Sequence, residues 1–529
     1  MTTATTTVSS VVDADAFATW FGMLTPSART EFSNQLAHWE SRPDALTAKS
    51  AIFTRFQRAY QQDPTFYPTC RAHFDAVAAL EPSLCLLTED TLSDAEKESY
   101  SELLFFGSLC KPLNFIPLFM QLWATIRVYV LPGMAILFPL LTLLAPYILL
   151  RFIFKLPITL GSYTHLLQSM ISGNVGAIFP SGEGGFAPAA GPSQGMSPIA
   201  IAKQVSVVLI TLVQGIVQPY WSFQHLRRID GLLTTHGDSV LALYDHYQAL
   251  DAALTKHGIT FFRCPLPPLP SSRVAAAQAM LNSTYLRLAL RYVGRLEVIM
   301  SIAHHPDMRP VRWVRSATPV FRIRDTYDFQ VDRATRHAAS ATLDRVQGTH
   351  VLLTGPNKGG KSTVLRALSI SALLAHTYGC AIGSLTATPF SKMFVCLKPD
   401  DLPGSKSRFE REIEFTASTL RAASCPQPHL LPILVFIDEL YHSTNPPDAL
   451  RSCEIYSAQL WKMSNVASII STHLFDWVEK APETIQRLCC PADRDPETGE
   501  VRFSYQLLHG VCTVSSVDTL LRKNGLSCA

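Results

Sequence analysis

The sequence predicts two unlike halves: a mainly α-helical N-terminal half with apolar, membrane-like segments, and an α/β C-terminal half. Three observations predict this division. Before about residue 320 the apolar residues recur at helical spacing or form long uncharged runs, whereas beyond Phe321 short β-like runs alternate with helices. The chain is 47 % apolar and only 16 % charged, against roughly 25 % charged residues in a typical soluble protein. Its 529 residues exceed the ~250–300 at which a single core stops growing, so we expect several units.

Shifts in composition divide the chain into six ranges. Aromatic residues at helical spacing mark the start, and glycine, serine and proline dominate a long stretch before residue 203. We expect a helical N-terminal domain at 1–110, one or more apolar membrane segments at 111–157, a flexible linker at 158–203, a possible second membrane segment at 204–224, a helical lever or core region at 225–320, and an α/β domain at 321–529.

The longest uncharged run predicts contact with a membrane. It covers the 23 residues 128–150 and is bracketed by Arg127 and Arg151. About 20 apolar residues cross a bilayer, and membrane helices tolerate internal prolines such as the three present here. A second stretch at 204–223 is weaker because it contains three glutamines. The alternative is a buried hydrophobic hairpin of a soluble domain.

A glycine-rich loop between a strand and a helix predicts a phosphate site. The apolar strand 351–353 leads into Gly355-x4-Gly360-Lys361-Ser362, which is the P-loop pattern. Its backbone N–H groups and the start of the following helix favour phosphate oxygens. Lys361 is expected to reach the β- and γ-phosphates of ATP, and Ser362 to ligate Mg²⁺. The predicted nucleotide-binding residues are Gly355, Pro356, Asn357, Lys358, Gly359, Gly360, Lys361, Ser362 and Thr363.

Two further strands end in residues suited to hydrolysis. The run 432–440 is apolar up to Asp438-Glu439, as expected of a buried parallel strand. We expect Asp438 to hold Mg²⁺ through water and Glu439 to act as the general base. A third strand, 467–471, is followed by Thr472-His473. His473 is expected to sense the γ-phosphate, although a structural histidine would leave the same pattern.

Together these segments resemble the ATPase domain of the MutS family of DNA mismatch-repair proteins. The loop GPNKGGKST is similar to the family's loop, with Asn357 at its distinctive asparagine, and STHLFDW matches its histidine motif. The stretch 400–420 resembles the family's signature loop and helix, where Ser407, Phe409 and Glu412 fall on matching positions. The resemblance covers about 286–525.

The resemblance implies an α/β P-loop NTPase with an ABC-type ATPase core, using ATP and Mg²⁺. In the family the serine matched by Ser407 approaches the nucleotide of the partner subunit, which implies catalysis in trans within a homodimer or a MutS-like heterodimer.

The chain also departs from the family pattern. Gly404-Ser405-Lys406 and Arg408 alter the signature loop, and Tyr441, His442 and Ser443 stand where the family usually has glycines. The N-terminal half shows no recognisable mismatch-reading domain. A hydrophobic anchor joined to this ATPase is similar to the divergent, membrane-associated branch of the family.

An arginine-rich window bears on DNA binding. Residues 287–345 contain eleven arginines, no lysine and six acidic residues. Arginines interleaved with aromatic residues suit phosphate contact and stacking. The alternative is an ion-paired surface, so duplex DNA is expected here mainly from the family resemblance.

Two functions fit these features. The first is ATP-driven dimerisation coupled to binding of mismatched or branched DNA. The second is a membrane-anchored ATPase switch that acts on a protein or membrane partner without reading DNA. Because the first residues lack the basic and apolar regions of a secretory signal, we expect a membrane-associated protein that is not secreted. Its ATPase domain would lie on the cytosolic or nuclear side.

Overall fold

The computed structural model describes residues 12–88, 94–171, 213–260, 267–397, 407–424, 431–494 and 501–514, together with Ser206, Ile210 and Leu521. These residues form two compact units, and each is interrupted in sequence. Unit 1 combines 1–81, 246–264 and 289–529, and unit 2 combines 82–245 and 265–288. The ranges expected from composition stay predictions. Most of the expected linker lies outside the described residues, as does part of the second apolar stretch.

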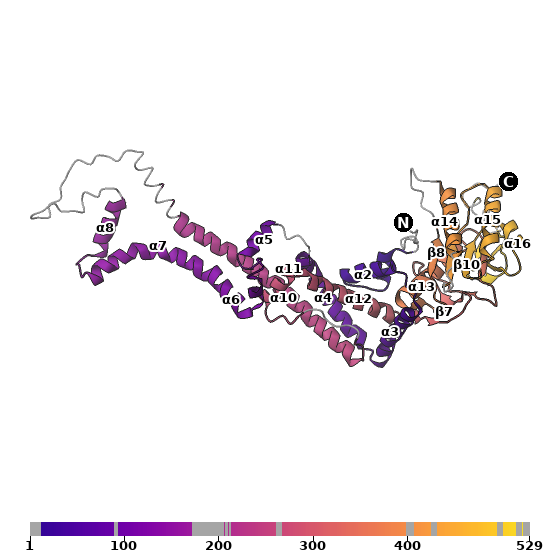
Figure 1. Cartoon of the computed structure of the whole chain (residues 1–529), viewed down its shortest axis with the longest axis horizontal. Coiled ribbons are helices and arrows are strands. Elements are labelled where there is room, and N and C mark those ends of the chain that lie inside the picture. The colour runs from indigo at the N-terminus through magenta and orange to yellow at the C-terminus, as the bar shows by residue number, and fades with distance from the viewer. Residues whose placement is uncertain are drawn as a thin grey trace, which may run out of the picture. The chain divides into compact units, whose positions relative to one another are not determined.

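The N-terminal half is helical and the C-terminal part is α/β, which confirms the coarse fold prediction (Figure 1). The α-helices are α1 (Ala14–Trp20), α2 (Pro26–Leu36), α3 (Pro43–Gln62), α4 (Phe66–Thr88), α5 (Asp94–Ser101), α6 (Pro117–Thr125), α7 (Leu131–Ile148), α8 (Leu160–Ile171), α10 (Gln218–Lys256), α11 (Ser272–Leu281), α12 (Ser283–His304), α13 (Lys361–Tyr378), α14 (Arg408–Ala423), α15 (Pro446–Leu460) and α16 (Phe475–Lys480).

Unit 1 is built on two main sheets. A six-stranded sheet has the order β14-β11-β5-β10-β9-β8, and a four-stranded sheet has the order β2-β7-β3-β4. The strands are β1 (Met308–Pro310), β2 (Arg312–Trp313), β3 (Phe321–Thr326), β4 (Ala339–Leu343), β5 (His350–Thr354), β6 (Cys380–Ile382), β7 (Ser384–Ala387), β8 (Lys392–Cys396), β9 (Ile433–Ile437), β10 (Val466–Ser471), β11 (Gln486–Cys489), β12 (Ala492–Arg494), β13 (Val501–Phe503) and β14 (Leu508–His509).

The centre of the six-stranded sheet brings the three predicted strand ends together. β10 pairs in parallel with both β5 and β9. Every residue of these three strands is buried, which explains their continuous apolar sequence, because helices cover both faces of a parallel sheet. The carboxyl ends of parallel strands meet at one edge, so the segments after Thr354, Ile437 and Ser471 lie side by side.

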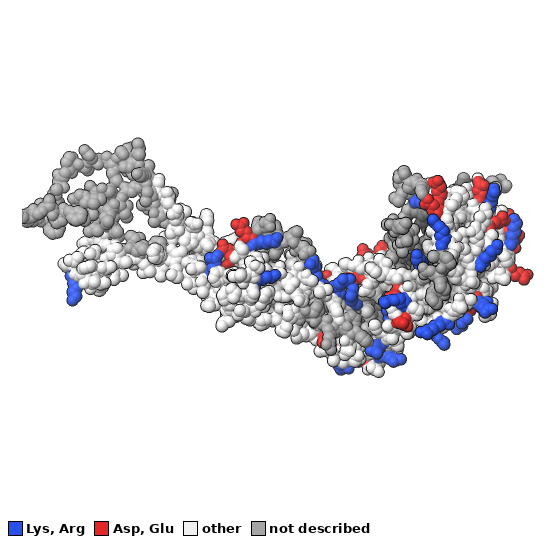
Figure 2. Space-filling view, in the orientation of Figure 1, with Lys and Arg blue, Asp and Glu red and all other residues white. Residues whose placement is uncertain are grey.

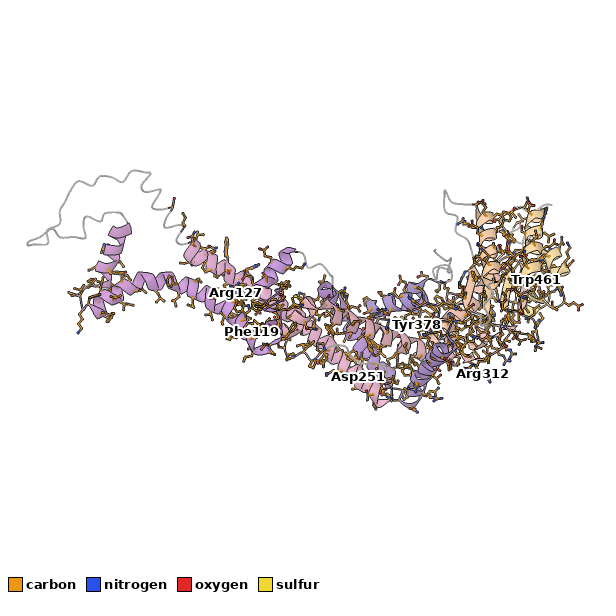
Figure 3. The ribbon with its side chains drawn as sticks, in the orientation of Figure 1. Phe119, Arg127, Asp251, Arg312, Tyr378 and Trp461 are labelled. Atoms are coloured by element: carbon orange, nitrogen blue, oxygen red, sulfur yellow. The ribbon has the colours of Figure 1, made fainter. Side chains whose placement is uncertain are left out.

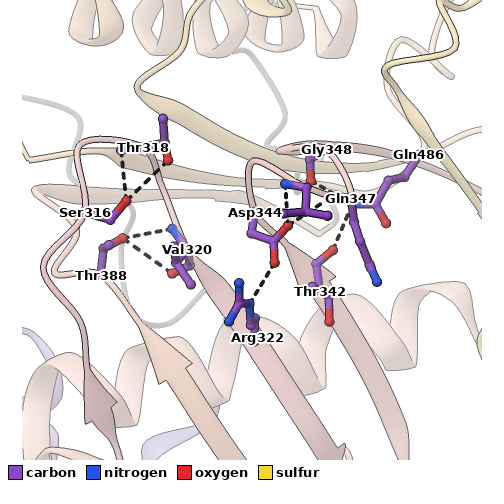
Figure 4. A network of polar contacts seen from close by, with 11 residues as sticks. Ser316, Thr318, Val320, Arg322, Thr342, Asp344, Gln347, Gly348, Thr388 and Gln486 are labelled. Atoms are coloured by element: carbon purple, nitrogen blue, oxygen red, sulfur yellow. Dashed lines mark hydrogen bonds and ion pairs between the residues drawn. The ribbon is translucent and has the colours of Figure 1, made fainter.

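A polar network ties the two sheets of unit 1 together at the turn between β4 and β5 (Figure 4). From β11, the Gln486 amide donates to the carbonyl oxygens of Thr342 in β4 (2.8 Å) and Gly348 in the turn (2.7 Å). Asp344 accepts from Arg322 of β3 at 2.7 Å. Gly348 has φ 110°, and a Cβ there would lie 2.7 Å from the Thr484 carbonyl oxygen, so the turn requires glycine.

The first helices of the chain belong to the same compact unit as the α/β sheet. The Glu297 carboxylate of α12 accepts hydrogen bonds from the backbone and hydroxyl of Thr25, next to the start of α2. Gly294 lets α2 approach α12, because a Cβ there would lie 2.7 Å from the Ser27 carbonyl carbon. Trp39 stacks on His376 of α13, with ring centroids 3.8 Å apart. α13, which carries Tyr378 (Figure 3), is buried along most of its length.

Unit 2 consists of helices around a small apolar core. The core members come from the segment after α5, from α6, α10 and α11, and from the π-turn after α6: Leu103, Leu104, Met120, Val128, Leu226, Ile229, Leu233, Ala276 and Ala277. The Arg273 guanidinium of α11 donates to both carboxylate oxygens of Asp230 in α10, at 2.9 and 2.8 Å. α11 also approaches α10 closely, since a Cβ on Gly237 would lie 1.8 Å from the Ser272 carbonyl oxygen.

Within the helical stretch from α6 to residue 153, a π-turn at Ile126–Val130 comes just before Pro132. Further π-turns lie at Leu149–Ile153, at the end of this stretch, and at Val213–Val217, before α10. Proline lacks an N–H and its ring displaces the carbonyl four residues earlier. The wider turn, closed by the Leu131 N–H on the Ile126 carbonyl, makes room for the displaced carbonyl.

Within the described residues, one helical segment, Pro117–Phe138, is long and apolar enough to span a membrane, and a shorter apolar one covers Leu144–Ile153. Only 17 % of the 18-residue apolar window of the first segment is buried, and buried residues of the segment such as Met120 and Val128 belong to the core of unit 2. Arg127 lies inside the segment Pro117–Phe138 and pairs with Glu102. Figure 3 shows the positions of Arg127 and of Phe119 in α6. The predicted run 128–150 includes side chains outside the described set, and spanning by it stays a prediction.

Candidate active site

The loop between β5 and α13 has a backbone that requires glycine at two positions. Gly355 has φ 145°, and a Cβ there would lie 2.7 Å from the Cys490 carbonyl oxygen. Gly360 has φ 98° and caps α13. The first N–H groups of α13 have no partner within the helix, as at any helix start. The expected strand, glycine-rich loop and helix are therefore present, and the open helix end faces the loop.

Lys361 is the first residue of α13 and is buried, with 4 % of its surface exposed. Its ammonium donates to the carbonyl oxygens of Gly355 (2.9 Å) and Pro356 (3.2 Å) and lies 3.1 Å from His473 Nε2. Burial lowers the pKa of Lys361, while the carboxylates of Glu439 and Asp438 oppose that shift. The Lys361 ammonium group is thus held over the loop by two carbonyl groups of the loop itself.

Asp438 and Glu439 are held by one hydroxyl group. The Ser471 hydroxyl, at the end of β10, donates to Asp438 Oδ1 at 2.5 Å and accepts from the Glu439 N–H at 2.8 Å. Because β9 and β10 are adjacent, their carboxyl ends place these residues together. Sequence reasoning missed Ser471. The only signal was its place as the last strand residue before Thr472-His473.

Glu439 and His473 form a polar pair at the edge of the sheet. Glu439 Oε1 lies 3.1 Å from His473 Nε2. The hydrogen bond from His473 is the main reason that the pKa of Glu439 falls to about 2, against the opposing effect of burial. The same ring nitrogen lies within reach of Lys361. One nitrogen either accepts from Lys361 or donates to Glu439, so the site allows two alternative arrangements.

A cavity of about 420 Å³ lies beside the loop. Of the predicted site residues, Glu439 and all loop residues from Pro356 to Thr363 line it. The other walls come from 327–339 and Tyr505. The rings of His337 and Tyr505 are stacked, with centroids 5.5 Å apart and planes 24° apart. Sequence reasoning did not identify this stacked pair, because the two rings come from segments 168 positions apart.

The donor atoms suit Mg²⁺. Ser362 offers a hydroxyl and Asp438 a carboxylate, one oxygen of which is engaged by Ser471. Mg²⁺ usually takes one or two protein carboxylates and completes its shell with water and substrate phosphates. Among the described residues there is no cluster of three histidine, cysteine or acidic side chains that would hold a metal ion alone. The protein groups fit a metal bound together with a nucleotide.

Ser407 does not line this cavity. It caps α14: its hydroxyl accepts from the Glu410 N–H at 3.2 Å, while the Ser407 N–H donates to the Glu410 carboxylate at 3.1 Å. Its predicted role in trans concerns a second chain and stays a prediction. The altered loop residues 404–406 lie outside the described residues.

Part of the arginine-rich window is engaged in ion pairs. Arg291 and Arg295 pair with Glu31, and Arg322 pairs with Asp344. These contacts favour the ion-paired interpretation at these three positions. Arg336 lies over the Tyr327 ring, 4.1 Å from its centroid, and both line the cavity.

Comparison with known proteins gives a partial match. The family described as MutS domain V matches residues 351–519. The chain is 27 % identical over 262 residues to the DNA mismatch repair protein Msh6 of Gallus gallus and 29 % identical over 255 residues to that of Homo sapiens. These matches cover 44 % and 43 % of this chain but only 19 % and 18 % of the relatives. The C-terminal part of the chain is therefore related to the MutS family, and the relationship is limited to that part.

Proposed function

We propose, from the relationship of its C-terminal part to the MutS family, that this chain binds and hydrolyses ATP and couples ATP-driven dimerisation to binding of mismatched or branched DNA. The observation that carries the proposal is the site around Lys361. The buried Lys361 ammonium and the ionised Glu439 carboxylate each lie 3.1 Å from His473 Nε2, beside a cavity lined by the glycine-rich loop.

In this proposal the loop and Lys361 receive the phosphates of ATP. The ammonium group leaves the carbonyl oxygens of Gly355 and Pro356 for phosphate oxygens, which are stronger, charged acceptors. Ser362 and Asp438 would hold Mg²⁺, which neutralises phosphate charge when bound. The stacked rings of His337 and Tyr505 line the same cavity and would contact the base.

Glu439 would then act as the general base. Its low pKa keeps the carboxylate ionised, so that it orients a water molecule and accepts its proton as the water oxygen attacks the γ-phosphorus and the bond to ADP breaks. Once Lys361 contacts phosphate, His473 Nε2 is released from it and can donate to Glu439 or to the γ-phosphate. Ser407 of a second chain would complete the site.

The proposal is tested by ATP turnover of the purified full-length chain in detergent. Lys361→Ala should abolish nucleotide binding, and Glu439→Gln should bind ATP and retain it unhydrolysed. Normal ATP affinity of the lysine variant would contradict the assignment of the loop. Rapid turnover by the glutamine variant would remove Glu439 as the base.

The DNA and dimer parts of the proposal rest on the relatives, which are named DNA mismatch repair proteins. Turnover should rise several-fold with mismatched or branched duplex DNA, and ATP should shift the chain from monomer to dimer in light scattering. Mixing Ser407→Ala chains with Lys361→Ala chains tests the composite site, since only an intermolecular arrangement gives partial activity. Turnover indifferent to all DNA would remove the DNA-coupled function.

A second candidate is a membrane-anchored ATPase switch that acts without DNA, and the surface of α7 favours it. Met134, Leu137, Phe138, Leu141 and Leu144 are all exposed. Figure 2 shows this region as an almost uncharged surface with basic side chains at one end. Exposed apolar surface of this extent marks a membrane or protein contact. In this candidate the protein is membrane-associated, with the ATPase on the cytosolic or nuclear side.

Flotation with lipid vesicles tests the membrane candidate. The full chain should float with vesicles of phosphatidylcholine and phosphatidylserine, and Leu137→Asp with Phe138→Asp should reduce the floated fraction. Substitution of exposed Val346 by Asp, in unit 1, is the matched control. A chain that stays at the bottom of the gradient, while remaining monodisperse without detergent, would exclude this candidate.

A further inference from the structure

Helix α14 buries a polar stripe. Glu412, Thr416 and Thr419 are only 5, 3 and 1 % exposed, and their spacing places them on one face of the helix. A buried polar group without a partner costs free energy, so the position of such a helix is determined by where its partners lie.

Two of the three partners come from the turn that follows the catalytic carboxylate. The Tyr441 hydroxyl lies 2.7 Å from Thr416 Oγ1, and the Ser443 hydroxyl donates to Glu412 at 2.9 Å. Thr416 Oγ1 also lies 3.0 Å from the carbonyl oxygens of Glu412 and Ile413, and either hydroxyl of the Thr416–Tyr441 pair can be the donor. The third partner is different: Tyr456, which bonds Thr419 at 2.9 Å, belongs to α15.

The turn itself has a conformation that side chains rarely adopt. Tyr441 has φ 56° and Glu439 has φ 53°, both in the left-handed region. A bulky residue remains there only when its surroundings hold it in place. Tyr441 is 3 % exposed, and its ring packs edge-on against Phe409 of α14, with centroids 5.8 Å apart. On the other side, Ser471 holds the Glu439 N–H.

We propose that Tyr441 is a positioning residue that couples helix α14 to the catalytic carboxylate. Its bond to Thr416 holds the left-handed turn and with it the approach of Glu439 to His473. This inference rests on the proposed ATP hydrolysis and adds how the site is controlled. A shift of α14, whose first turn is capped by Ser407, would move the turn through Thr416 and Tyr441 and so change the hydrolysis rate.

The test compares two tyrosine-to-phenylalanine variants of the full-length chain. Tyr441→Phe and Tyr456→Phe each remove one buried hydroxyl that bonds a threonine of α14, but only Tyr441 belongs to the turn that follows Glu439. We expect similar decreases in melting temperature for both. In single-turnover experiments Tyr441→Phe should hydrolyse ATP about three- to tenfold more slowly with an unchanged Kd for ATP, which is the effect expected of one neutral hydrogen bond. Tyr456→Phe should hydrolyse at the wild-type rate.

A mutant cycle provides the second measurement. Thr416→Val should slow hydrolysis to the same degree as Tyr441→Phe, the double variant should be no slower than either, and Thr419→Val should leave the rate unchanged. Equal rates for Tyr441→Phe and Tyr456→Phe, or additive effects of Tyr441→Phe and Thr416→Val, would overturn the inference. If Lys361→Ala failed to abolish ATP turnover, the proposed function itself would be overturned instead of this inference. The two failures are therefore distinguishable.

Discussion

At the scale of single residues, Ser471 organises the acidic pair. Its hydroxyl is the only group that both orients the Asp438 carboxylate and fixes the Glu439 backbone among the hydrogen bonds of the described residues. A serine at a strand end is an ordinary residue in sequence. Its role arises because β10 lies next to β9 and ends level with it.

Replacement of this hydroxyl should affect chemistry more than binding. We expect Ser471→Ala to lower kcat for ATP hydrolysis about ten- to a hundredfold while KM changes little, because one buried donor to a charged acceptor contributes about 1.5–3 kcal/mol. Steady-state kinetics provide the measurement, with Ser468→Ala as the control, since Ser468 lies on the same strand and bonds His350 instead. A variant with raised KM and unchanged kcat would place Ser471 in binding.

At the scale of elements, glycines decide how closely helices of unit 2 approach. Gly231 and Gly237 both lie in α10, six positions apart. A Cβ at Gly237 would meet the Ser272 carbonyl oxygen at 1.8 Å, whereas a Cβ at Gly231 would meet nothing within 4 Å. The contact between α10 and α11 therefore requires glycine at one of these positions only.

Alanine at these two sites should have opposite effects. Gly237→Ala should destabilise the protein by about 1–3 kcal/mol, because backbone atoms of α11 cannot move away without separating the helices. Gly231→Ala should stabilise it by about 0.5–1 kcal/mol, because alanine favours the helix and restricts the unfolded chain. Denaturant unfolding followed by circular dichroism gives both values, and destabilisation by both variants would show that Gly231 is also required.

At the scale of the whole molecule, acid should weaken unit 1 through its buried histidines. Burial lowers the pKa of His350 to about 4 and that of His376 to about 3. Both stay neutral in the folded protein at pH values where the unfolded chain, with a pKa of about 6.5, takes up a proton. The unfolded state then binds more protons, so stability rises with pH in this range and falls as the pH drops from about 6.5 to about 4.

The pH dependence should be visible in one variant. For His350 the loss amounts to on the order of 3 kcal/mol across this range. His350→Asn should be less stable than wild type at pH 7 but should lose less stability between pH 6.5 and 4. Melting temperatures measured across this range provide the test. Exposed His38→Asn, as a control, should retain the wild-type slope. An unchanged slope for His350→Asn would mean that the pKa of His350 is not lowered in the folded protein.

Local pattern predicted much of the α/β part. The strands before Gly355, Asp438 and Thr472 are present, because a buried parallel strand leaves a continuous apolar run and a tight loop leaves glycines. The helical character of the N-terminal half follows from apolar spacing in the same way. Such signals depend on neighbours within a few positions, and the chain order itself records them.

The other features depend on pairs of residues that are remote in sequence. Only the tertiary structure places helices α1 to α3 in the unit that holds the six-stranded sheet, stacks His337 on Tyr505, and joins Tyr441 to Thr416. The physical reason is that side-chain packing and hydrogen bonds act over a few ångströms regardless of chain separation. Which remote segments come that close depends on the register and order of the strands, and no local pattern records that order.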